Sequence, residues 1–154
     1  MTTTAPSAPI GLIIACHGLL AEGLVEACGL IWGQSLQPAD QTPPTQKTFP
    51  VHPFSLVPGE EPKHTAKRLK ALVKKCDKGR GVIVMVDMLG GTPASLALAL
   101  MVDKQVEVIT GVNLPMVLTA VSLDLTMDLK TASDKLAKTG RLAIHHAGDL
   151  LSEG

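Results

Sequence analysis

Short apolar runs, separated by stretches long enough to hold a helix, dominate the hydrophobic pattern of this chain. Four runs rich in Val and Ile predict buried strands at 9–15, 50–57, 81–86 and 106–110. Strands that alternate with helix-length segments are typical of a parallel sheet covered by helices. The pattern therefore predicts an α/β fold with a doubly wound, mostly parallel sheet, for which 2-1-3-4 is a common strand order.

Five helices are expected in the amphipathic segments. In 20–32, Leu20, Leu24 and Cys28 fall on one face, as in a helix that packs against a sheet. Residues 60–76 begin with two glutamates and end with two lysines, which the helix dipole favours, and we expect this helix to be the most exposed. Further helices are expected at 93–102, at about 115–123 and within 127–138.

Two segments depart from this regular pattern. Residues 34–48 are polar and Pro-rich without a hydrophobic period, which predicts an exposed, mobile loop. The stretch GRLAIHHAG at 140–148 alternates weakly and is consistent with a last, short strand. Its direction does not follow from the sequence.

The 154-residue length favours a single domain, which we place at 9–150 after a flexible N-terminus at 1–8. The spacing of Cys16, Cys28 and Cys76 matches neither a zinc site nor a disulfide framework, so reduced thiols in a cytoplasmic protein are expected. No apolar run reaches the roughly 18 residues of a membrane-spanning helix. The charge is balanced at 14 basic and 14 acidic residues, without a long basic stripe, which disfavours nucleic-acid binding.

His17 and Asp87 stand at corresponding places, each directly behind a predicted buried strand. In a 2-1-3-4 sheet these two strands are neighbours, and ligands bind in the crevice between their carboxyl ends. A carboxylate that accepts a hydrogen bond from Nδ1–H leaves Nε2 of the ring unprotonated and directed outward. The pair therefore predicts a nucleophilic or basic histidine with an orienting aspartate.

The stretch GGTP follows Asp87 after two residues and begins a predicted helix. Gly90 and Gly91 allow the backbone to approach a ligand closely, Thr92 is suited to cap the helix, and the N–H groups of a helix start favour an anion such as phosphate. Together with His17 and Asp87 these residues indicate a phosphoryl group carried on histidine. Each feature alone also has an ordinary structural explanation, as a hydrogen-bonded histidine, a turn aspartate or a routine cap.

The sequence resembles the enzyme IIA component of the mannose family of the phosphoenolpyruvate-dependent sugar phosphotransferase system. The matching stretches cover most of the chain from about residue 10 to 147. They are GLIIACHGLLAEGLVEACGLIWG, VPGE at 57–60, GVIVMVDMLGGTPASLAL, EVITGVNLPMVL and the weaker LAKTGRLAI.

The resemblance implies that His17 is phosphorylated at Nε2, that Asp87 is its hydrogen-bond partner, and that Gly90, Gly91 and Thr92 hold the phosphate. It implies no metal and no cofactor. The phosphoryl donor would be the small protein HPr and the acceptor an enzyme IIB, with the membrane reached only indirectly through permease components. It also implies an antiparallel edge strand, here 141–147, that is exchanged in a homodimer.

Three other interpretations remain open at this stage. The same phosphohistidine would also suit a regulatory switch that passes no phosphate to sugar. A small tetrapyrrole metal chelatase can begin with a strand followed by His-Gly, but such a protein does not explain GGTP beside Asp87. The IIA-like subunit of dihydroxyacetone kinase shares the histidine at the strand end, whereas the GGTP turn favours the sugar-transport branch.

Overall fold

The computed structural model describes residues 8–32, 51–102 and 105–152. The expected mobile loop at 34–48 lies outside the described residues. The same holds for the expected flexible N-terminus, apart from its last residue. Among the helices that are described, none is long and apolar enough to cross a membrane.

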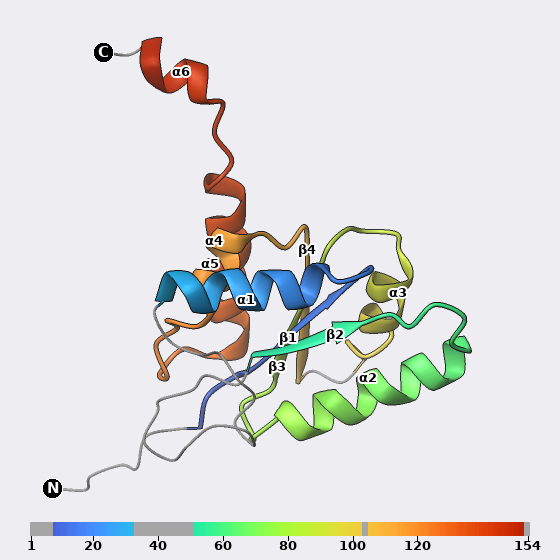
Figure 1. Ribbon diagram of the computed structural model, residues 1–154. Coiled ribbons are helices and arrows are strands. Elements are labelled where there is room, and N and C mark those ends of the chain that lie inside the picture. Colours follow the sequence, from blue (N-terminus) through green and yellow to red (C-terminus); the bar gives the residue numbers. More distant parts are fainter. Residues whose placement is uncertain (1–7, 33–50, 103–104, 153–154) are drawn as a thin grey trace, which may run out of the picture.

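A four-stranded sheet forms the centre of the molecule (Figure 1). Its strands are β1 (Gly11–Cys16), β2 (Val51–Ser55), β3 (Val82–Val86) and β4 (Val106–Thr110). All neighbouring pairs are parallel and the order is β2-β1-β3-β4, which confirms the predicted topology. β1 and β3 are buried along their whole length, as their uninterrupted apolar sequences require.

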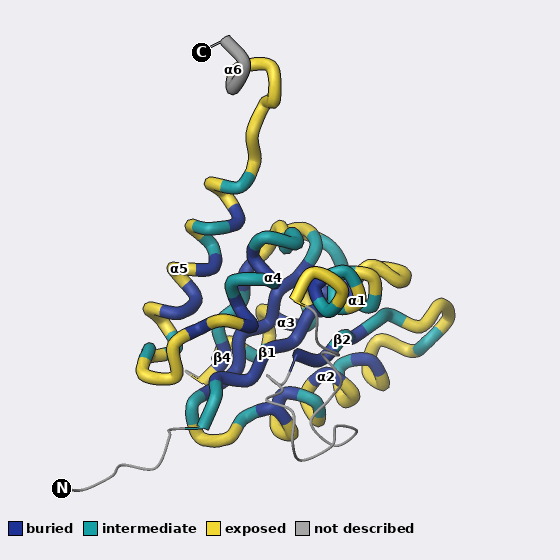
Figure 2. Tube along the Cα trace, turned by 60° about the vertical axis from the view of Figure 1, so that its left-hand side comes forward, coloured by how far each residue is buried: buried dark blue, intermediate teal, exposed yellow. Residues whose placement is uncertain are grey.

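Helices cover both faces of the sheet and divide the core in two. One face carries α1 (Leu20–Trp32), α4 (Leu114–Ala120) and α5 (Leu129–Leu142), and the other carries α2 (Pro62–Cys76) and α3 (Thr92–Leu98). The side chains of successive β1 residues point to opposite faces of the sheet. Ile14 packs with α1, α4 and α5, and Ile13 packs with α2 and α3. Figure 2 shows the buried positions gathered in the strands and on the inner sides of these helices.

The C-terminal part of the chain differs from the prediction. We expected an antiparallel strand at 141–147, but α5 continues to Leu142 and α6 (Ala147–Ser152) begins at Ala147. The reason is that Ala132, Leu136 and Gly140 continue a helical period of buried positions, which prevails over the weak alternation that follows. Beyond α5 the chain stands away from the sheet, with α6 at its far end (Figure 1).

Candidate active site

The carboxyl ends of β1 and β3 bring His17 and Asp87 together. The two strands pair in parallel with Ala15 opposite Val86, so the chain leaves both strands at the same level of the sheet. His17 follows Cys16 at the end of β1, and Asp87 follows Val86 at the end of β3. The neighbouring strand ends therefore bring the two predicted residues together.

Asp87 holds His17 through both the main chain and the ring. Its Oδ2 atom accepts a hydrogen bond of 2.9 Å from the backbone N–H of His17 and lies 2.7 Å from Nδ1. An ionised carboxylate only accepts hydrogen bonds, so Nδ1 carries the proton and Nε2 carries the free lone pair. The His17 side chain is 48% exposed, against 13% for Asp87, which leaves the ring accessible above a largely covered aspartate.

The hydrogen bonds of Asp87 keep its carboxyl group ionised. Partial burial raises the pKa of Asp87. Hydrogen bonds from the His17 main chain, the His17 ring and the Met88 N–H together lower that pKa by more than burial raises it, so the net pKa lies below the ordinary value. The Met88 bond is 2.9 Å long and reaches Oδ1, so both carboxylate oxygens have a donor.

Cys16 is the neighbour of His17 in sequence but takes no part in this site. Burial, followed by the negative charge of Asp87, raises the pKa of the Cys16 thiol to about 12. The sulfur therefore stays protonated and is a poor nucleophile. Cys16 belongs to the core cluster on the α1 side of the sheet, as the sequence predicted.

The glycine turn lies directly against the reactive edge of the imidazole. Gly90 has a φ of +92°, a left-handed conformation that favours glycine. A Cβ atom on Gly91 would lie 2.6 Å from Cε1 and 3.2 Å from Nε2 of His17, so the close approach of backbone to ring requires a glycine there. Gly91 also occupies the N-cap position of α3, and Thr92, which we expected as the cap, is the first helical residue.

Comparison with known proteins assigns the chain to a family. A sequence model described as "PTS system fructose IIA component", of the mannose-type enzyme IIA proteins, matches residues 11–137. The protein is a member of this enzyme IIA family. The assignment confirms the resemblance and argues against the metal chelatase.

Individual relatives agree with this enzyme IIA assignment. The chain is 32% identical over 108 residues to a mannose-specific EIIAB component of Escherichia coli K12, a match that covers 70% of this chain and 29% of that protein. It is 27% identical over 128 residues to a fructose-specific EIIA component of Bacillus subtilis, over 82% and 79% of the two chains. The crystal structure of a phosphotransferase EIIA from Streptococcus agalactiae superposes with a TM-score of 0.74 at 25% identity, over 91% of this chain and 98% of that one.

A cavity of about 570 Å³ opens beside His17 in this enzyme IIA protein. Thr92 and the turn after β1 form part of its lining, and a second wall comes from the end of β2 at Ser55 and from the segment that follows it, including Val57 and Glu60. Sequence reasoning had not placed this second wall in the site. The available signal was the position of VPGE at 57–60, because the end of β2 lies at the same sheet edge as the ends of β1 and β3.

The remaining histidines are not among the residues that line the cavity containing His17. His52 is buried on β2, while the exposed His146 lies 3.1 Å from Asp149 through its Nδ1 atom. In the described ranges, no three His, Cys, Asp or Glu side chains gather where they could hold a metal ion.

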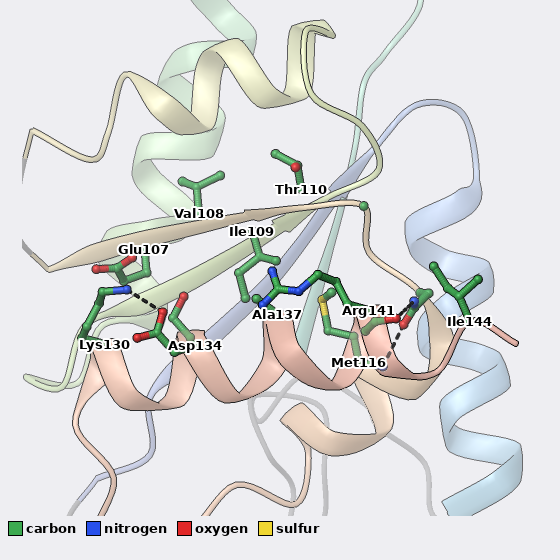
Figure 3. Close-up of a pocket in the computed structure, with 14 residues that line it drawn as sticks. Glu107, Val108, Ile109, Thr110, Met116, Lys130, Asp134, Ala137, Arg141 and Ile144 are labelled. Carbon is green, nitrogen blue, oxygen red and sulfur yellow. Dashed lines mark hydrogen bonds and ion pairs between the residues drawn. The ribbon is translucent and has the colours of Figure 1, made fainter.

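A second hollow lies between β4 and α5 of the enzyme IIA protein (Figure 3). It is lined by Ile109 and Met116 and by an ion pair between Lys130 and Asp134. Over the described residues β4 pairs only with β3, so this hollow runs beside a sheet edge that has no second strand.

Proposed function

We propose that the protein is a phosphocarrier that accepts a phosphoryl group from HPr on Nε2 of His17 and passes it to an enzyme IIB during sugar uptake. The observation that carries the proposal is the 2.7 Å contact between Nδ1 of His17 and Asp87, which leaves Nε2 as the free nitrogen of an exposed ring. Membership of the enzyme IIA family supports the same conclusion.

In this proposal His17 acts as a nucleophile. The lone pair of Nε2 attacks phosphorus while the bond from phosphorus to the donor breaks, and the positive charge that develops on the ring is stabilised by Asp87. Transfer of this kind depends mainly on positioning and on neutralising the phosphoryl oxygens. The backbone N–H groups of Gly90 and Gly91 and the hydroxyl of Thr92 would contact those oxygens, without a metal ion.

The partners follow from the same proposal. HPr and enzyme IIB would meet the protein in the cytoplasm, and the membrane would be reached only through permease components. We also propose a homodimer, supported by the edge of β4, which pairs with no further strand in the described part of the chain, and by the hollow beside it (Figure 3). Sedimentation of the purified chain would test the homodimer, and a monomer at all accessible concentrations would contradict it.

Phosphotransfer is the decisive experiment. The protein is incubated with phosphoenolpyruvate, enzyme I and the cognate HPr, in parallel with a His17→Ala variant, and the product is tested for acid-labile phosphate. Acid-labile phosphate that depends on His17 is the expected result. A folded wild-type protein that accepts none would contradict the proposal, and transfer onward to an enzyme IIB separates a transport component from a regulatory switch.

A further inference from the structure

One wall of the cavity beside His17 carries an acidic side chain, Glu60. The Glu60 side chain is only 15% exposed and lines the same cavity as His17 and Thr92. Asp87 already places one carboxylate beside the ring. A second uncompensated carboxylate would repel an approaching phosphoryl group, which is itself an anion, because charges in a partly closed cavity are weakly screened.

Arg68 reaches Glu60 from the far side of this wall. Its Nε donates to Oε1 and its Nη2 donates to Oε2, each at 2.8 Å, which is the two-pronged geometry specific to arginine. Arg68 itself lines a separate hollow behind the wall, together with Glu22 and Lys75. Its positive charge therefore compensates Glu60 without occupying the cavity of His17.

The surroundings fix both members of the pair. The Thr65 hydroxyl donates to Oε2 of Glu60 at 2.9 Å, and Nη2 of Arg68 also donates to the carbonyl oxygen of Ser55 at 3.1 Å. The guanidinium of Arg68 lies over the Phe54 ring, 4.6 Å from its centroid. These contacts join the end of β2, the loop that follows it and α2 into one rigid wall.

We propose that Arg68 is a positioning residue for phosphoryl transfer, which holds the Glu60 wall in place and cancels its charge so that an anionic phosphoryl group can approach Nε2 of His17. The inference rests on the proposed function, since it concerns the acceptance of phosphate at that nitrogen. It identifies the charge of Glu60, rather than the loss of Arg68 as such, as the cause of impaired transfer.

A small phosphoryl donor separates this inference from the identity of the protein partner. Phosphoramidate phosphorylates histidine without any partner protein. In that reaction the Nε2 lone pair attacks phosphorus, the phosphorus–nitrogen bond of phosphoramidate breaks, and the leaving nitrogen departs as ammonia. The rate of acid-labile labelling at His17 is measured for both phosphoramidate and phospho-HPr, with His17→Ala as the blank.

Three variants test the charge of the wall. Arg68→Met is expected to slow labelling by about tenfold with either donor, because it leaves Glu60 unpaired, and the deficit should shrink as salt is added. The labelling rate of the double variant Glu60→Gln/Arg68→Met should recover to within about threefold of the wild-type rate, although this variant has lost the same Arg68 side-chain contacts as Arg68→Met. Arg80→Met is the matched control. Arg80 precedes β3 and so lies at the amino ends of the strands, away from His17, where it donates to the carbonyl oxygens of Leu125 and Met127.

Each outcome of this experiment decides a different question. An Arg68→Met variant that labels as fast as wild type, or a folded double variant that stays as slow as the single one, would overturn the inference. Wild type that reacts with phosphoramidate but not with phospho-HPr would contradict the proposed function. The effect of Arg68→Met on the phosphoramidate rate would still decide whether the charge of Glu60 controls access to His17.

Discussion

Because Gly91 has no side chain, the ring of His17 can lie directly against its backbone, which fixes the position of Nε2. An added Cβ would lie 2.6 Å from Cε1 of His17, closer than packed atoms approach. Gly91→Ala should therefore displace the imidazole and reduce phosphoryl acceptance by at least about tenfold, in keeping with the strict positioning that transfer requires. The second-order rate constant of labelling measures this effect.

Gly23 provides the control for that substitution. A Cβ at Gly23 would meet no atom within 4 Å, and the residue lies on an exposed turn of α1. Gly23→Ala should raise the free energy of unfolding by about 0.5–1 kcal/mol and leave the labelling rate unchanged. Equal losses of rate in the two variants would show that Gly91 has no special relation to His17.

Asp87 gives a prediction in acid. Its pKa is lowered in the folded protein, so its stabilisation is complete above the ordinary value of 3.8 and is lost as the pH falls through the lower, folded value. The difference in unfolding free energy between wild type and Asp87→Asn should narrow as the pH falls below about 4. Urea unfolding at a series of pH values measures it, and a difference that widens in acid would contradict the assigned hydrogen bonds.

The residues of the site were predictable only in part. His17 and Asp87 follow directly from the rule that ligands bind at strand ends, because both residues directly follow buried apolar runs. Glu60 and Arg68 were not predicted as a pair, because their contact depends on how the loop after β2 folds back onto α2. Nothing in the spacing of eight residues by itself indicates an ion pair.

Among the elements, α4 and α5 are linked by the side chain of one asparagine. Asn113 caps α4 by accepting from the Met116 N–H at 3.1 Å, and its Nδ2 donates to the carbonyl oxygen of Gly140 in α5 at 2.9 Å. Asn113→Ala should lower the free energy of unfolding by about 1–3 kcal/mol through the lost cap and the lost bond. Asn113→Ser, which keeps a capping oxygen, should cost less, and urea denaturation distinguishes the two.

The helices and strands were predicted more reliably than their ends. The four strands and their order came from uninterrupted apolar runs, a signal that is strong when both faces of a strand are buried. The segment 141–147 was the exception, because its short alternation competes with a helical period that begins twelve residues earlier at Leu129 and extends to Leu142. A weak local pattern could not reveal that α5 would extend into this segment as far as Leu142.

At the scale of the whole molecule, the segment beyond α5 contributes little to the folded core. Ile144 is 77% exposed, and residues 145–149 are exposed as well. A chain that ends after Ala143 should keep its free energy of unfolding within about 0.5 kcal/mol of the full-length value, when both are measured as monomers in urea. A larger loss would show that the segment packs against its own chain.

Four exposed apolar side chains stand near the opening at His17. They are Leu19, Val57, Met88 and Leu89. Leu19 and Val57 line the cavity itself, while the other two follow Asp87 directly. A protein that covers these side chains must expel water from the opening as it binds, so partner binding and desolvation of the opening would occur in one step. Hydrolysis of a phosphorylated histidine would then compete with transfer only while the opening is uncovered.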